Sequence, residues 1–260
     1  MSDILDSPFI VFTVALVAQC LAAYAGDRLR RRGRAVRKDE REDLDTEKTA
    51  ILTLLALIIG FSFAMAVARY DQRKNYEEAE ANAIGTEYVR AALLPAESAA
   101  NARDLLIKYL DRRIVFYESR DRRRISRIDA DTAKLEAELQ SAILPAANAQ
   151  PTAVSALAVS GLNDVLNAHG YTQAAWWNRI PAAAWGLMGL TAIACNLLIG
   201  YGERRKSVVL LFVLPVVVSI SFLLIGDIDS PRGGMIRVLP QNLIALSQSL
   251  RVQEGRDGGK

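Results

Sequence analysis

The chain has 260 residues, of which 51% are hydrophobic, and its net charge is only +3 because 32 Lys and Arg residues nearly balance 29 Asp and Glu residues. The charges are segregated, however, since four stretches of about 20 residues contain none of them. This segregation excludes a soluble globular domain, a disordered chain and a secreted disulfide scaffold. It predicts an all-α integral membrane protein with four transmembrane helices and a helical insert between the second and the third.

The predicted elements begin with the four apolar spans. They cover residues 8–25, 49–68, 181–201 and 207–226. At roughly 1.5 Å of rise per residue, each is long enough to cross a hydrocarbon core of about 30 Å. The first span follows the acidic start MSDILDS, which lacks the basic residues of a signal peptide, so we expect a retained helix.

The spans divide the chain into four predicted parts. These are the first two transmembrane helices with their basic connection (1–70), the helical extramembrane domain (71–180), the third and fourth transmembrane helices (181–230) and the C-terminal tail (231–260).

Basic residues near the span ends predict the orientation. Residues 26–48 contain nine Lys and Arg residues, and Arg204, Arg205 and Lys206 follow the third span, whereas the N-terminal tail contains none. Short basic connections stay in the cytoplasm. We therefore expect the long insert and both termini to lie outside.

Helical periodicity continues through the insert. The second span is expected to run on to Leu94, where Pro95 ends it, and Gly170 is expected to cap the last helix of the insert. The other helices are predicted at residues 97–118, 125–144 and 151–168, with a connection bracketed by Pro145 and Pro151. We interpret the charged residues of the insert as solvated helix faces.

No pattern in the sequence supports catalysis or cofactor binding. Cys20 and Cys195 lie inside spans, and His169, next to a predicted helix end, is the only histidine, so these residues form no metal-ligand set. Phosphate-binding loops and hydrolase motifs are missing. We therefore expect no enzyme activity, no cofactor, no metal site and no nucleic-acid partner. Trp176, Trp177 and Trp185 are interpreted as an interfacial aromatic belt.

The second span carries the most informative pattern. Its small residues recur every four positions and therefore share one helix face, which consists of Ala56, Gly60, Ala64 and Ala68. Such a face allows close packing by another helix, and it can equally line a narrow path. Phe61 and Phe63 flank the face and are candidates for an apolar constriction. No span contains an ionisable relay, which argues against a proton-coupled transporter.

Charged residues gather where the second and fourth spans end and the third begins. Because these ends lie at one membrane face, the following residues are expected to share a plane: Arg69, Asp71, Arg73, Arg179, Asp227 and Asp229. One interpretation is an ion pair between Arg69 and Asp227 or Asp229 that locks the insert to the bundle. The other is a ring of surplus bases that selects anions at a pore mouth.

Two amides lie at similar depth in the first and third spans. They are Gln19 and Asn196. An amide without a hydrogen-bond partner is costly in hydrocarbon. We therefore expect the two to meet, or each to face a neighbouring subunit.

Two segments resemble a known family. They are LALIIGFSFAMAVARYDQRKNYEEAEANAIGTEYVRAALLP at 55–95 and DIDSPRGGMIRVLP at 227–240. Both are similar to segments of the bacterial bestrophin-like membrane proteins, and more distantly to bestrophins, which are pentameric anion channels. Gly60 and Phe61 match a GF step of the bestrophins, but Ser62 stands where a basic residue is expected. The acidic calcium clasp of the animal channels is not matched. Bestrophins also hold their large region in the cytoplasm, opposite to the orientation that the charges predict.

Together these observations predict a homo-oligomeric ion channel in a bacterial inner membrane. The lipid bilayer and further copies of the chain are the expected partners, and the resemblance implies a pentamer and chloride as the ion. The alternative is a non-conducting scaffold or sensor whose helical insert binds a partner.

Overall fold

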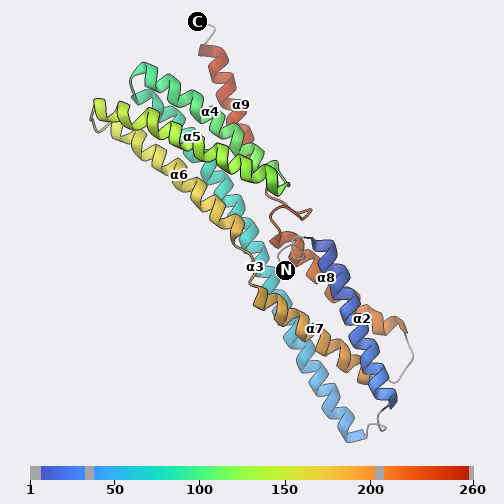
Figure 1. Cartoon of the computed structure of the whole chain (residues 1–260). Helices are drawn as coiled ribbons and strands as arrows, with labels where there is room; N and C mark the ends of the chain where they lie inside the picture. Colours follow the sequence, from blue (N-terminus) through green and yellow to red (C-terminus); the bar gives the residue numbers. More distant parts are fainter. Residues whose placement is uncertain (1–6, 33–37, 203–207, 258–260) are drawn as a thin grey trace. The chain divides into compact units, whose positions relative to one another are not determined.

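A computed structural model describes residues 7–32, 38–202 and 208–257. These residues are almost entirely helical and contain no strand, which confirms the all-α class. The helices are α2 (Pro8–Arg32), α3 (Lys38–Arg90), the short 3₁₀ helix η1 (Ala91–Leu93), α4 (Ala96–Glu118), α5 (Arg122–Ala149), α6 (Ser155–Trp177), α7 (Ala182–Gly202), α8 (Val208–Asp229) and α9 (Gln241–Asp257) (Figure 1).

The helices form two compact units, which we describe separately. The membrane unit comprises residues 1–70 and 179–237, and the helical unit comprises residues 71–178 and 238–260. The membrane unit therefore holds α2, the first part of α3, α7 and α8. The helical unit holds the last part of α3 with η1, α4, α5, α6 and α9.

The membrane unit contains the predicted spans. Four helices in the described part of the chain are long and apolar enough to cross a membrane. Their shared core is apolar, and its most buried members include Leu55, Ala66, Met188, Cys195 and Ile225. This core joins the first part of α3 to the other three spans.

Two glycines bring α2 and α7 into backbone contact. A β-carbon at Gly26 would overlap the carbonyl oxygen of Leu197, and a β-carbon at Gly200 would overlap that of Ala23. Small residues at such positions let membrane helices approach closely. Gly26 and Gly200 were not among the predicted contact residues.

The predicted pairing of amides at depth is confirmed. Asn196 Nδ2 donates to Gln19 Oε1 at 3.0 Å, and Gln19 Nε2 donates to Ser219 Oγ at 3.1 Å. All three side chains are buried. They join α2, α7 and α8 through hydrogen bonds that need no water.

In the helical unit, α4 packs on α5, and α5 packs on α6 (Figure 1). Of the apolar stripe that helical spacing predicts at 151–168, Val154 and Leu157 are exposed and only the later residues are buried. The core of this unit is built from apolar residues at helical spacing on all three helices. They include Leu105, Leu106 and Tyr109 on α4, Ile128, Leu139 and Ile143 on α5, and Leu162 and Val165 on α6.

Two predicted helix ends are wrong. Pro145 lies inside α5, which continues to Ala149, and α6 runs through Gly170 to Trp177. A glycine costs a helix only about 1 kcal/mol relative to alanine. Burial of Thr172, Ala175 and Trp176 in the next turns offsets that cost. Residues 146 and 147, after Pro145, are buried in the same way.

The three tryptophans that we interpreted as an aromatic belt have different surroundings within their own units. Trp176 is buried in the helical unit, with its ring 5.1 Å from that of Phe116. Trp185 packs in the membrane unit against Phe222, with ring centroids 6.2 Å apart. Trp177 is 73% exposed. The interfacial interpretation is therefore wrong for Trp176, which belongs to an aromatic core.

Candidate functional site

The first part of α3 has one buried and one exposed face within the membrane unit. Leu55, Ser62 and Ala66 are buried against the other spans. The small-residue face, made of Ala56, Gly60, Ala64 and Ala68, is exposed. A β-carbon at Gly60 would meet no atom within 4 Å. Among the described residues of the membrane unit, the small residues of α3 therefore form an open face.

The two phenylalanines beside this face also point outward. Phe61 is 65% exposed and Phe63 is 38% exposed. Ser62, between them, is buried at 3% exposure. The position at which the resemblance to the bestrophins leads one to expect a base therefore faces the core of the unit here and carries an uncharged hydroxyl group.

The two aspartates at the membrane boundary turn into the membrane unit. Asp227 accepts hydrogen bonds from the backbone amides of Met235 at 2.7 Å and Ile236 at 2.8 Å. Asp229 accepts one from the backbone amide of Ile180 at 3.0 Å, and its other oxygen lies 3.5 Å from Arg179 Nε. Both aspartates are buried. They hold the segment after α8 and the start of α7 in place.

The remaining boundary charges are divided between the units. Arg69 lies in the membrane unit and donates to the sulfur of Met65 at 3.6 Å. Asp71 and Arg73 belong to the helical unit, where Asp71 is exposed and Arg73 is buried. An ion pair between Arg69 and either boundary aspartate stays a prediction.

Buried charges in the helical unit correct the interpretation of its acids as solvated. Glu77, Glu80 and Glu87 of α3 are at most 1% exposed, and Arg113 of α4 is fully buried. The three glutamates follow one another at spacings of three and seven residues, which puts them on one helix face. Ala81, one of the apolar residues of α3, is buried as well. Glutamates that recur at helical spacing together with buried apolar residues indicate a buried helix face. This pattern could have predicted the burial of the three glutamates from the sequence.

Glu80 ties three helices together. One of its oxygens accepts from Arg113 Nε, and the other accepts from Tyr117 Oη at 3.1 Å and Thr172 Oγ1 at 3.1 Å. Burial alone would lower the pKa of Arg113, but the adjacent Glu80 carboxylate outweighs it and raises that pKa. Burial, reinforced by Glu80, also raises the pKa of Tyr117 well above its usual value. Arg113 therefore keeps its positive charge in the buried contact between α3 and α4.

Glu77 holds the start of α9. Its Oε1 accepts hydrogen bonds from the backbone amides of Asn242 at 2.9 Å and Leu243 at 3.0 Å, and its Oε2 accepts one from Asn242 Nδ2. A carboxylate at this position satisfies free amides of the first helical turn and opposes the positive end of the helix dipole. The C-terminal helix is therefore fastened to α3.

His169 lies inside α6 and not at a helix end as expected. Its Nδ1 is 2.6 Å from Glu136 Oε1 of α5. The contact joins two helices of the helical unit and is partly buried.

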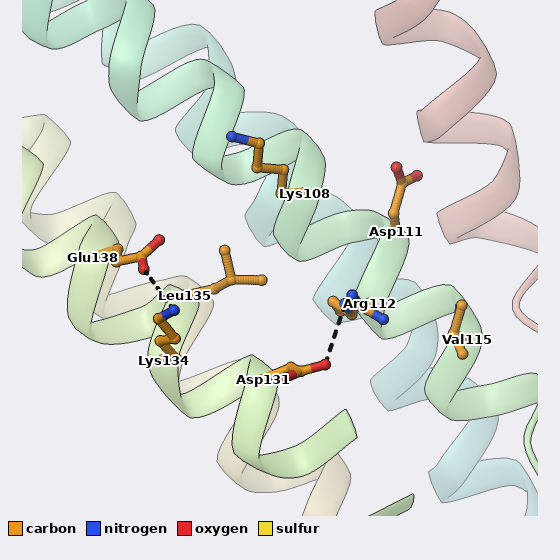
Figure 2. Close-up of a pocket in the computed structure, with 8 residues that line it drawn as sticks. All are labelled: Lys108, Asp111, Arg112, Val115, Asp131, Lys134, Leu135 and Glu138. Carbon is orange, nitrogen blue, oxygen red and sulfur yellow. Dashed lines mark ion pairs between the residues drawn. The ribbon is translucent and has the colours of Figure 1, made fainter. Parts of the chain in front are cut away.

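A groove of about 370 Å³ between α4 and α5 carries only charges that are engaged locally (Figure 2). Arg112 lies 3.6 Å from Asp131, and Lys134 lies 3.9 Å from Glu138. Asp111, at its edge, binds Arg251 of α9 at 2.9 Å. These exposed pairs mark a solvated helix surface and not a ligand site. No cluster of three or more potential metal ligands occurs among the residues that the structure describes.

Comparisons with known proteins give a match to a protein-family model and several matches to solved structures. A family model described as the bestrophin-like domain matches residues 13–243. A crystal structure of a bacterial bestrophin homologue from Klebsiella pneumoniae is 16% identical, with 92% of this chain and 98% of that chain covered and a TM-score of 0.60. The crystal structure of a single-residue variant of that homologue is 14% identical, with 95% of this chain and 98% of that chain covered and a TM-score of 0.65. No curated protein matches. Identities this low establish a shared fold and no more.

Proposed function

The chain belongs to the bestrophin-like family, and from that premise we propose that it is a homo-oligomeric ion channel with a passive pathway on the symmetry axis. The supporting observation is the exposed small-residue face of α3, whose Gly60 has no neighbour within 4 Å of a β-carbon position. Each copy would contribute this face to the axis. The number of copies, five, is taken from the resemblance to the bestrophins.

The packing of one copy leads to this arrangement. The opposite face of α3 is used in an apolar core with α2, α7 and α8. An apolar core offers an ion no substitute for its water shell. A conducting path therefore has to run between copies, and symmetry places it on an axis. Small side chains on α3 leave room for it, and Phe61 and Phe63 supply an apolar constriction that dewetting can close.

We further propose that bases at the boundary favour anions. Asp227 and Asp229 are buried and engaged by backbone amides and by Arg179. Their negative charge is therefore turned away from a passing ion. Arg69 at the end of the second span then supplies a ring of positive charge, one per copy.

The pathway is tested by flux. Purified protein in liposomes is expected to release chloride faster than potassium. Gly60→Leu and Ala64→Leu are expected to abolish the leak or the assembly, because a bulky side chain blocks or separates whatever meets the face. Leu57→Ala, at an exposed position of the same helix, is the matched control and should keep both. Absence of any leak from the wild-type protein would favour the scaffold or sensor.

Selectivity has its own experiment. Arg69→Asp is expected to shift the reversal potential toward cations while oligomer size is unchanged. If Arg69 instead forms a structural ion pair, the same variant weakens assembly and leaves the selectivity of the remaining channels as it was. If Arg69→Asp keeps both the wild-type oligomer size and the wild-type reversal potential, Arg69 has neither the selective nor the structural role.

The protein is proposed to lie in the bacterial inner membrane, with the insert and both termini outside according to the charge of its short connections.

A further inference from the structure

Among the buried carboxylates of α3 in the described structure, Glu87 is the one whose oxygens accept no hydrogen bond. Its side chain has no exposed surface, and neither carboxylate oxygen has a hydrogen-bond partner in the described part of the chain. Glu77 and Glu80, by contrast, each accept at least three hydrogen bonds. A buried carboxylate without partners is costly when ionised. Glu87 therefore has a different task from the two glutamates that fasten helices.

The backbone of α6 closes directly over this carboxyl group. A β-carbon at Gly161 would overlap Glu87 Oε2 and would come within 3.0 Å of Arg90 Cδ. With the Glu87 and Arg90 side chains in these positions, glycine leaves the space that they occupy. The seal over Glu87 thus depends on close helix contact and not on a polar partner.

Asp164 competes with Glu87 for the guanidinium group of Arg90. Arg90, one helical turn farther along α3, has its NH1 3.3 Å from Asp164 Oδ2 of α6. These are the charged groups that act on Glu87, one from its own helix and one from α6. Arg103 of α4 donates instead to the carbonyl oxygen of Tyr88 at 3.2 Å. Arg90 therefore has two carboxyl groups within reach of its flexible side chain.

We propose that Glu87 is a proton-operated switch in the contact between α3 and α6. When neutral, it lets α6 seal over it at Gly161 while Arg90 binds Asp164. When ionised, it draws Arg90 away from Asp164 and opens the α6 backbone around Gly161 to water. The step is loss of one proton from the Glu87 carboxyl group to solvent, with exchange of one ion pair for another.

The direction of the pH dependence follows from the environment. Burial, which the opposing effect of Arg90 does not cancel and Asp164 reinforces, raises the pKa of Glu87 from 4.5 to about 8. A pKa that is higher in the folded state means that the sealed form is favoured most below pH 4.5. This contribution falls as pH rises and is lost once pH passes about 8.

The experiment combines infrared spectroscopy with hydrogen exchange on the purified full chain. The wild-type protein should show the carbonyl band of a protonated carboxyl group at neutral pH, and the band should disappear as pH rises through about 8. Between pH 4.5 and about 8, amides of α6 around Gly161 should gain exchange beyond the intrinsic base catalysis, by up to about tenfold per pH unit, and the gain should level off at higher pH. Glu87→Gln should remove both changes. Glu78→Gln, at an exposed position on the same helix, should remove neither.

A second variant keeps the test decisive if Glu87→Gln fails to fold. Asp164→Asn leaves Glu87 in place but removes the competing acceptor for Arg90. It should move the infrared transition to lower pH. A wild-type protein without the band at neutral pH would overturn the proposal, and so would an Asp164→Asn protein with an unmoved transition. None of these measurements requires ion flux, so the switch stands or falls apart from the proposed channel.

Discussion

Arg112 and Arg113 are neighbours in sequence, yet they occupy opposite environments. The Arg113 side chain is fully buried beside Glu80, whereas Arg112 is 48% exposed and lies 3.6 Å from Asp131. Both look alike in a charged helical sequence. The difference arises because α4 turns one face toward α3 and the other toward solvent, and this gives the two residues very different energetic weights.

We expect Arg113→Met to destabilise the protein by about 3–5 kcal/mol, because it leaves the Glu80 carboxylate buried without its counter-charge. Arg112→Met is the matched control, and an exposed pair of this kind contributes about 0–1 kcal/mol. Unfolding in detergent micelles, followed by circular dichroism, measures both. A Glu80→Gln/Arg113→Met double variant should recover part of the loss. Equal stability of the two single variants would show that the Glu80 pair does not secure the helical unit.

Hydrogen-bond partners could be predicted from the sequence where depth in the membrane alone determines them. Gln19 and Asn196 are amides at matching depth in apolar spans, so hydrocarbon leaves them few alternatives to each other. Sequence-based prediction failed for Glu80 and Arg113, because a charged residue on a water-exposed helix has solvent as a default partner. Only the tertiary contact of α3 with α4 removes that solvent.

At the scale of elements, burial in the packed core determines where α5 and α6 end more strongly than helix propensity does. α5 continues through Pro145 and α6 through Gly170, although both residues are poor helix formers. The buried turns beyond them supply stabilisation that local signals do not reveal. The apolar spans, by contrast, were predicted from apolar length alone, and each falls on a helix that is long and apolar enough to cross a membrane.

The contact of α2 with α7 allows a test at this scale. Gly200→Ala would drive a β-carbon into the carbonyl oxygen of Ala23, and overpacking of this kind costs about 1–3 kcal/mol. Gly186→Ala, in the same helix, meets nothing within 4 Å. It is expected to be neutral or slightly stabilising. Thermal unfolding in detergent separates the two, and an unchanged melting temperature for Gly200→Ala would mean that the helices separate at no cost.

At the scale of the whole molecule, fold and family were predictable from the sequence, and the predicted orientation rests on the charges of the short connections. The resemblance rested on residues 55–95 and 227–240, and the family match extends to residues 13–243. Membership supports a channel-like membrane protein. It leaves the direction of insertion to the charges of the short connections, because the same bundle packs equally well either way up.

Labelling of single cysteines decides the orientation. In a background with Cys20 and Cys195 replaced by serine, Arg34→Cys tests the first connection at a position outside the described residues. Asp131→Cys tests α5, where the side chain is 52% exposed. The nine bases of residues 26–48 are expected to keep that connection in the cytoplasm. An impermeant thiol reagent should therefore label Asp131→Cys in intact cells and should reach Arg34→Cys only after the cells are opened. The reverse pattern would place the helical unit in the cytoplasm, as in the bestrophins. In that case the resemblance, and not the charge count, would have been the better guide.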